Sequence, residues 1–100
     1  MAQRPQGSES KVVTGDVLVF SGSKSVYSIV ISTVGATAGD TIILRDGGAT
    51  GTIRFRYEVP AAATGEPINL GRYGIQFTTN CYYSEQATAA GKIWATIIFV

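Results

Sequence analysis

The residue types that most often carry out catalysis are scarce in this sequence. Histidine is absent, which removes the commonest general base, the usual Ser–His and Cys–His pairs, and most zinc sites. The single cysteine, Cys81, has no evident partner base. We expect it to be a small buried residue of a strand. One cysteine also leaves no possibility of an intrachain disulfide.

Seven acidic residues are scattered singly along the chain, so they form no local pair for acid–base chemistry. The five that fall at expected strand ends or turns, where acids are common, are Asp16, Asp40, Asp46, Glu66 and Glu85. The Asp46-Gly47-Gly48 turn lacks the alternating oxygen ligands of a calcium loop. No phosphate-binding or dinucleotide-binding glycine pattern occurs. The sequence therefore predicts a protein that is not an enzyme and that holds no metal or cofactor.

Charge and hydropathy argue against two classes of partner. Eight Lys and Arg oppose seven Asp and Glu, for a net charge of +1. Nucleic-acid-binding domains usually carry a basic excess or stripe, so we expect no nucleic-acid partner. No apolar run approaches the roughly 18 residues of a membrane span, so no membrane partner is expected. Residues 1–11 lack the apolar segment of a signal peptide.

The composition predicts the elements that must carry any functional side chain. Valine, isoleucine and threonine together number 30, glycine numbers 12 and leucine only three. This composition is typical of short strands joined by glycine turns. A parallel sheet needs longer crossover segments than this chain has room for. We therefore expect an all-β antiparallel β-sandwich of about eight short strands, jelly-roll-like, with a small closed barrel as the alternative.

The chain divides into an arm and one domain. Residues 1–11 are polar and predict an extended N-terminal arm, and residues 12–100 predict a single sandwich domain. We expect the arm to dock on a neighbouring subunit or on its own domain. Arg4 and Pro5 within the arm and Lys11 at its end are predicted to contact a neighbour.

Two alternating strands predict which side chains face the core. In the first, residues 25–33, Tyr27, Ile29 and Ile31 share one face. In the second, residues 53–59, one face carries Ile53, Phe55, Tyr57 and Val59 and is expected to lie in the core. The opposite face of this second strand carries Arg54, Arg56 and Glu58. That polar face is either solvated or in contact with a neighbouring subunit.

The last strand, residues 92–100, is apolar on both faces. Its first face carries Ile93, Ala95, Ile97 and Phe99. Its second face carries Trp94, Thr96, Ile98 and Val100, and it is covered either by a loop or arm of the same chain or by another chain. We predict that Trp94, Ile98 and Val100 lie in an interface. Residues 16–20 have the same two-sided character, which indicates a central strand or an oligomer interface.

Three stretches resemble small β-sandwich proteins encoded among the structural genes of tailed bacteriophages. They are FSGSKSVYSIVI (residues 20–31), LRDGGATGTIRFRYEVP (residues 44–60) and GIQFTTNCYY (residues 74–83), all within the span from Val13 to Val100. The resemblance implies a virion component without enzyme activity: a head decoration or cement protein, or a small head or tail accessory protein. It carries no individual functional residues across to this chain.

From this resemblance we expect the chain to bind the major capsid protein or another virion protein. We also expect it to form homo-oligomers, of which a trimer is one possibility, and to be located in the virion after assembly in the host cytoplasm. The alternative hypothesis is a carbohydrate-binding or adhesion sandwich of a tail or fibre, with Tyr73, Tyr82, Tyr83 or Trp94 stacking on sugars. The three tyrosines are otherwise expected at the rim of the sandwich.

Overall fold

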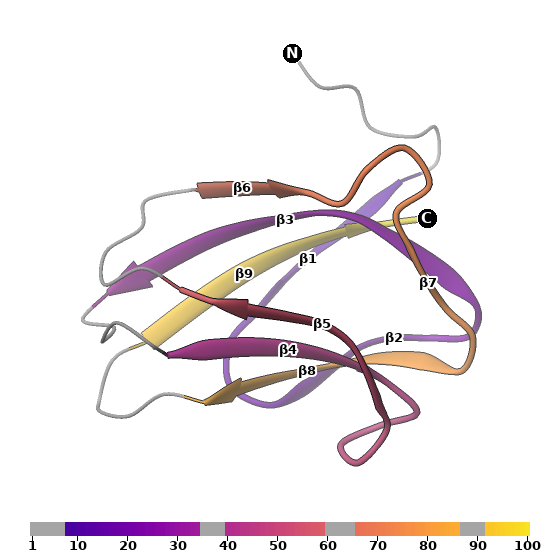
Figure 1. The fold of residues 1–100 in the computed structure, drawn as a ribbon, viewed down its shortest axis with the longest axis horizontal. Helices are drawn as coiled ribbons and strands as arrows, with labels where there is room; N and C mark the ends of the chain where they lie inside the picture. The colour runs from indigo at the N-terminus through magenta and orange to yellow at the C-terminus, as the bar shows by residue number, and fades with distance from the viewer. Residues whose placement is uncertain (1–7, 35–39, 60–65, 87–91) are drawn as a thin grey trace.

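The computed structural model describes residues 8–34, 40–59, 66–86 and 92–100. Arg4 and Pro5 therefore lie outside the described residues. No helix occurs in these ranges, and their regular structure consists of nine strands (Figure 1). The strands are β1 (Glu9–Val13), β2 (Val17–Ser21), β3 (Lys24–Val34), β4 (Thr41–Asp46), β5 (Thr52–Glu58), β6 (Glu66–Asn69), β7 (Ile75–Phe77), β8 (Asn80–Gln86) and β9 (Lys92–Phe99).

The strands form two antiparallel sheets that pack face to face, which confirms the predicted β-sandwich. Sheet A has the order β1-β9-β3-β6, with β7 also pairing with β3, and sheet B has the order β2-β8-β4-β5. This order is that of a jelly roll in which β6 and β7 share the place of one strand. That split accounts for nine strands where about eight were expected. In Figure 1 the two layers lie one above the other, with β6, β3 and β9 over β5, β4 and β8.

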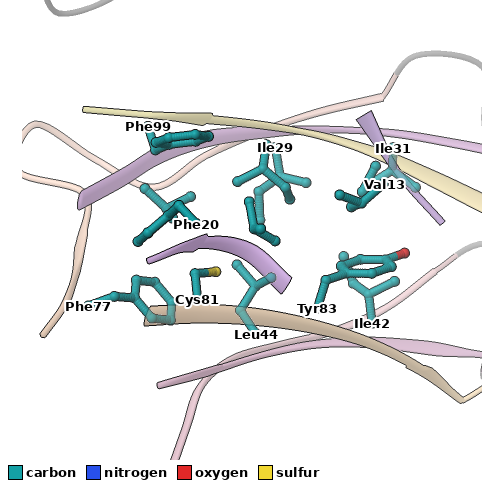
Figure 2. Close-up of a cluster of buried hydrophobic side chains, with 14 of the residues drawn as sticks. Val13, Phe20, Ile29, Ile31, Ile42, Leu44, Phe77, Cys81, Tyr83 and Phe99 are labelled. Atoms are coloured by element: carbon teal, nitrogen blue, oxygen red, sulfur yellow. The ribbon is translucent and has the colours of Figure 1, made fainter. Parts of the chain in front are cut away.

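The core fills the space between the two sheets, and Figure 2 shows the side chains that meet there. Phe20 lies at one end, with its ring edge-on to Phe77 at 5.9 Å between centroids and tilted against Phe99 at 4.7 Å. Ile29 from sheet A and Leu44 from sheet B are fully buried between the layers. Such burial contributes about 1.5–3 kcal/mol for each large apolar side chain, so this layer is the main source of stability.

The prediction for β3 was wrong at Tyr27 because of a β-bulge. The pairing of β3 with β9 shifts by one residue between Val26 and Ser28. A bulge interrupts the alternation of side chains, so Val26 enters the core in the place expected for Tyr27. Val26, Ile29 and Ile31 are completely buried, whereas Tyr27 is half-buried.

A second bulge explains the two-sided character of residues 16–20. We expected a central strand or an oligomer interface, but β2 is an edge strand that pairs only with β8 among the described strands. Its register shifts between Leu18 and Phe20. Consecutive residues Val19 and Phe20 therefore both enter the core, while Leu18 is exposed.

At the other edge of sheet B, β5 follows the predicted alternation only in part. Phe55 and Tyr57 are half-buried and pack against the core, and Val59 is buried just beyond the strand. Ile53 was also expected in the core, but its side chain is 47% exposed. The register of β5 with β4 shifts at Arg54, so Ile53 lies opposite Arg45 and away from the inner face.

Candidate interaction surfaces

The outward face of sheet A is the first candidate surface, and β9 runs through its middle. Because Ile93, Ala95, Ile97 and Phe99 point into the core, the alternate residues of β9 point outward. Strand pairing places Thr96 between Val12 of β1 and Val30 of β3, and it places Pro67 of β6 beside Val30. We call this set of side chains, Val12, Val30, Pro67, Trp94, Thr96 and Ile98, the sheet A surface.

Exposure varies along the sheet A surface. Val12 is 64% exposed and Pro67 is exposed, whereas Val30, Trp94 and Thr96 are half-buried. Ile98, which was predicted to contact a partner, is only 9% exposed and offers little area to one. Val100, at the chain end, is 39% exposed. The part of this surface available to a partner is thus the row from Val12 to Pro67 together with Trp94.

Lys11 has a different place from the one expected. We predicted an arm over residues 1–11, but β1 begins at Glu9 and pairs with β9 from Glu9 to Val13. The Lys11 ammonium donates a hydrogen bond to the carbonyl oxygen of Leu18 at 3.0 Å. Lys11 thereby links β1 of sheet A to β2 of sheet B.

The charged stripe on β5 forms a second, separate surface at the far edge of sheet B. Arg54, Arg56 and Glu58 are exposed on the outward face of that strand. Arg54 lies 3.7 Å from the Asp46 carboxylate. The predicted interface residues of β5 and those of β9 therefore lie on two surfaces that belong to different sheets.

Asp46 organises the end of sheet B, and its role was not anticipated. Its two carboxylate oxygens accept hydrogen bonds from the backbone N–H groups of Thr78, Thr79 and Asn80 and from the Thr78 hydroxyl. In return, the Asn80 side-chain oxygen accepts from the N–H groups of Gly47 and Gly48. These bonds clamp the β4–β5 turn to the start of β8. The pKa of Asp46 lies well below its ordinary value, because hydrogen bonds stabilise the charged carboxylate. The bond from the Thr78 N–H has the largest effect, and the bond from the Thr79 N–H has the next largest.

Cys81 has a structural place rather than a catalytic one. It is completely buried, as expected. Burial, with a smaller effect of the nearby Asp46 charge, raises its pKa to about 12. A thiol of that pKa is almost wholly protonated near neutral pH, so it is a poor nucleophile.

Asp16 and Glu85, which are far apart in sequence, are linked through the Glu85 backbone, and each carboxylate accepts a structural hydrogen bond. Asp16 accepts a hydrogen bond from the Glu85 backbone N–H at 3.1 Å, and Glu85 accepts one from the Tyr83 hydroxyl at 2.8 Å. Burial, followed by the bond to Glu85, raises the pKa of Tyr83 far above its ordinary value. Within the described ranges, no three His, Cys, Asp or Glu side chains are grouped to hold a metal.

The aromatic residues considered as sugar platforms do not share a face. Tyr83 was expected at the rim but is completely buried in the core, where Figure 2 shows it beside Ile42. Tyr82 points to the outer side of sheet B because its neighbours Cys81 and Tyr83 point inward. Trp94 belongs to the opposite sheet, and Tyr73 is 78% exposed in the turn before β7.

No helix in the described ranges has the length and hydropathy to cross a membrane. Neither known protein-family models nor curated proteins match this chain.

Proposed function

We propose that this chain is a non-enzymatic structural subunit of a tailed-bacteriophage virion, a capsid decoration or cement protein that binds the major capsid protein lattice. The resemblance of residues 20–31, 44–60 and 74–83 to such proteins motivates the proposal. A jelly roll is also an architecture found repeatedly in viral capsid domains, although a fold alone does not specify a function.

The observation that carries the proposal is the group of apolar side chains within the sheet A surface, which lies among Ser10, Ser28 and Ser32 on the same face. Val12, Val30 and Pro67 line up across β1, β3 and β6, with Trp94 on the same face. A solvated sheet face normally carries polar residues at such positions. Aromatic residues are enriched in protein–protein interfaces, and Trp is prominent among the residues that dominate binding energy. We infer that this face lies against the capsid lattice.

Co-sedimentation with capsids purified without this protein tests the proposal. The wild-type chain is expected to pellet with capsids and to raise their resistance to heat. Val12→Asp places a charge on the sheet A surface and is expected to weaken capsid binding about ten-fold or more. Leu18→Asp is the matched control, because Leu18 is an exposed apolar residue on sheet B. Failure of the wild-type chain to bind, or equal losses in the two variants, would contradict the proposal.

The carbohydrate-binding hypothesis is not supported by a comparable cluster of side chains on one surface. Its four aromatic side chains lie in the core, on opposite sheets and in a turn, so they do not form one stacking platform.

A further inference from the structure

Among the edge strands in the described part of the molecule, β5 is the longest. β5 pairs with β4 alone among the described strands, and its seven residues include neither Pro nor Gly. The other edge strands are shorter, since β1 and β2 have five residues each. Lys11 links β1 to β2, β6 has four residues including Pro67, and β7 has three. Proteins usually protect such an edge, because unpaired backbone groups readily pair with another chain.

The hydrogen bonding of β5 to β4 shows which backbone groups face outward. The Val59 N–H donates a hydrogen bond to the Asp40 carbonyl oxygen at 2.8 Å. Val59 and Asp40 are the next opposed pair of the ladder after Glu58 and Thr41. Opposed residues in an antiparallel ladder alternate between hydrogen-bonded and non-hydrogen-bonded pairs. Tyr57 therefore bonds toward β4, and the backbone groups of Arg56 and Glu58 point away from the sheet.

We propose that two copies of this chain join by antiparallel pairing of β5 with β5, about a two-fold axis at Tyr57. Arg56 then lies opposite Glu58 of the partner subunit, and Glu58 lies opposite Arg56 of the partner subunit. These two pairs form four main-chain hydrogen bonds. The two four-stranded sheets become one continuous sheet across the dimer.

The charge pattern selects this register over its neighbours. A two-fold axis at Arg56 places Arg56 opposite Arg56 of the partner subunit, and an axis at Glu58 places Glu58 opposite Glu58 of the partner subunit. An axis at Phe55 places Arg54 opposite Arg56 of the partner subunit. Only the axis at Tyr57 opposes unlike charges without a like pair. This axis also leaves Arg54 outside the segment that pairs with the partner subunit. Arg54 lies where the register of β5 with β4 shifts, and its side chain is 3.7 Å from the Asp46 carboxylate.

The inner face of β5 supports the same arrangement. Phe55 and Tyr57 stack on each other with 6.4 Å between ring centroids and an angle of 10°, yet both remain half-buried. In the dimer, Tyr57 meets Tyr57 of the partner subunit and Phe55 meets Val59 of the partner subunit. Aromatic cross-strand pairs of this kind stabilise antiparallel sheets.

This dimer goes beyond the proposed function and does not depend on it. It uses the edge of sheet B and leaves the sheet A surface, including Val12 and Trp94, available to a capsid. Its tests are made on the purified chain in buffer, so a failure to bind capsids and a failure to dimerise are observed separately.

Sedimentation equilibrium combined with charge reversal is the first test. The wild-type chain is expected to form a dimer. Arg56→Glu and Glu58→Arg each turn two attractive contacts into repulsive ones and are expected to raise the dimer dissociation constant about 10- to 100-fold. The double variant, with both changes, restores the opposition of unlike charges and is expected to dimerise like the wild type. Arg72→Glu, in the exposed turn before β7, is the control that leaves dimerisation unchanged.

Disulfide capture is the second test and reports the register itself. Across the axis, the two Tyr57 residues form a non-hydrogen-bonded pair with Cα atoms about 4.5 Å apart, within the range of a disulfide. Tyr57→Cys is expected to oxidise to a covalent dimer. The two Phe55 residues lie four positions apart, about 13 Å along the strands, so Phe55→Cys is expected to stay monomeric on a denaturing gel. The native Cys81 is buried and does not compete.

Several results would overturn the proposal. A wild-type monomer at high concentration, or a trimer, excludes the dimer. Equal changes in the dimer dissociation constant for Arg56→Glu and Arg72→Glu would also exclude the proposed dimer. Failure of Tyr57→Cys to cross-link, or equal cross-linking of Phe55→Cys, excludes the register centred on Tyr57.

Discussion

Gly74 stands where the turn before β7 touches β3, and its replacement by alanine is expected to loosen one end of the sandwich. Its φ of +66° is a conformation that residues with a side chain rarely adopt. An added Cβ would lie 2.4 Å from the carbonyl oxygen of Val26 and 3.0 Å from its carbonyl carbon. Both are backbone atoms of β3, so β7 would have to move away from the pairing of Val26 with Ile75.

Gly71, in the same turn, provides the matched comparison. Its φ is +89°, but an added Cβ meets no atom within 4 Å. The positive φ alone costs about 1–2 kcal/mol, and the lower freedom of alanine in the unfolded chain offsets about 0.4–1 kcal/mol. We therefore expect a loss of about 1 kcal/mol for Gly71→Ala. The forced backbone shift adds about 1–3 kcal/mol at Gly74, for a loss of about 3 kcal/mol.

Thermal unfolding followed by far-UV circular dichroism measures the difference. In a domain of this size, 1 kcal/mol shifts the Tm by about 4–8 °C. We expect the Tm to fall by roughly 5 °C in Gly71→Ala and by roughly 15 °C in Gly74→Ala, with urea unfolding giving the same ranking. Equal shifts in the two variants would refute the reasoning, because the contact with Val26 would then contribute nothing.

Two further predictions concern buried polar groups. The pKa of Asp46 is lower in the folded state than its ordinary value of 3.8, so its contribution to stability is present above that value and is lost as the pH falls toward the folded-state pKa. Asp46→Asn is expected to be less stable at pH 7 and to lose stability less steeply below pH about 5 in urea titrations; a slope equal to that of the wild type would contradict this. Tyr83→Phe removes the hydroxyl that bonds to Glu85 and is expected to lower the free energy of unfolding by about 1–3 kcal/mol; an unchanged urea midpoint would show that this hydrogen bond contributes no net stability.

The pattern of residues was sufficient for the fold class and for much of the core. Thirty β-branched residues and short apolar runs predicted antiparallel strands, and the alternation in residues 92–100 correctly assigned Ile93, Ala95, Ile97 and Phe99 to the core. Cys81 was also correctly expected to be a small buried residue of a strand. These features are local, since strand periodicity depends only on the chain's own geometry.

The bulges and clamps were not predictable in this way. Val26 lies in the core in place of Tyr27 because β3 must match the register of β9, whose paired residues at this point lie at least 70 positions later in the chain. Asp46 and the Thr78–Asn80 turn both carry ordinary turn signals, and nothing in either signal indicates that they bond to each other.

The sequence by itself determined the strand content, the inward face of β9 and the lack of histidine chemistry, because periodicity and residue type are local properties. Only the tertiary structure decided which outward residues share a surface. It separated the β5 charges from the apolar row on sheet A, and it placed Lys11 across the side of the sandwich. It also left β5 at an edge, where the order Arg56, Tyr57, Glu58 becomes self-complementary. The physical reason is that strand order is set by packing two sheets over one core, which depends on pairs of residues far apart in the chain.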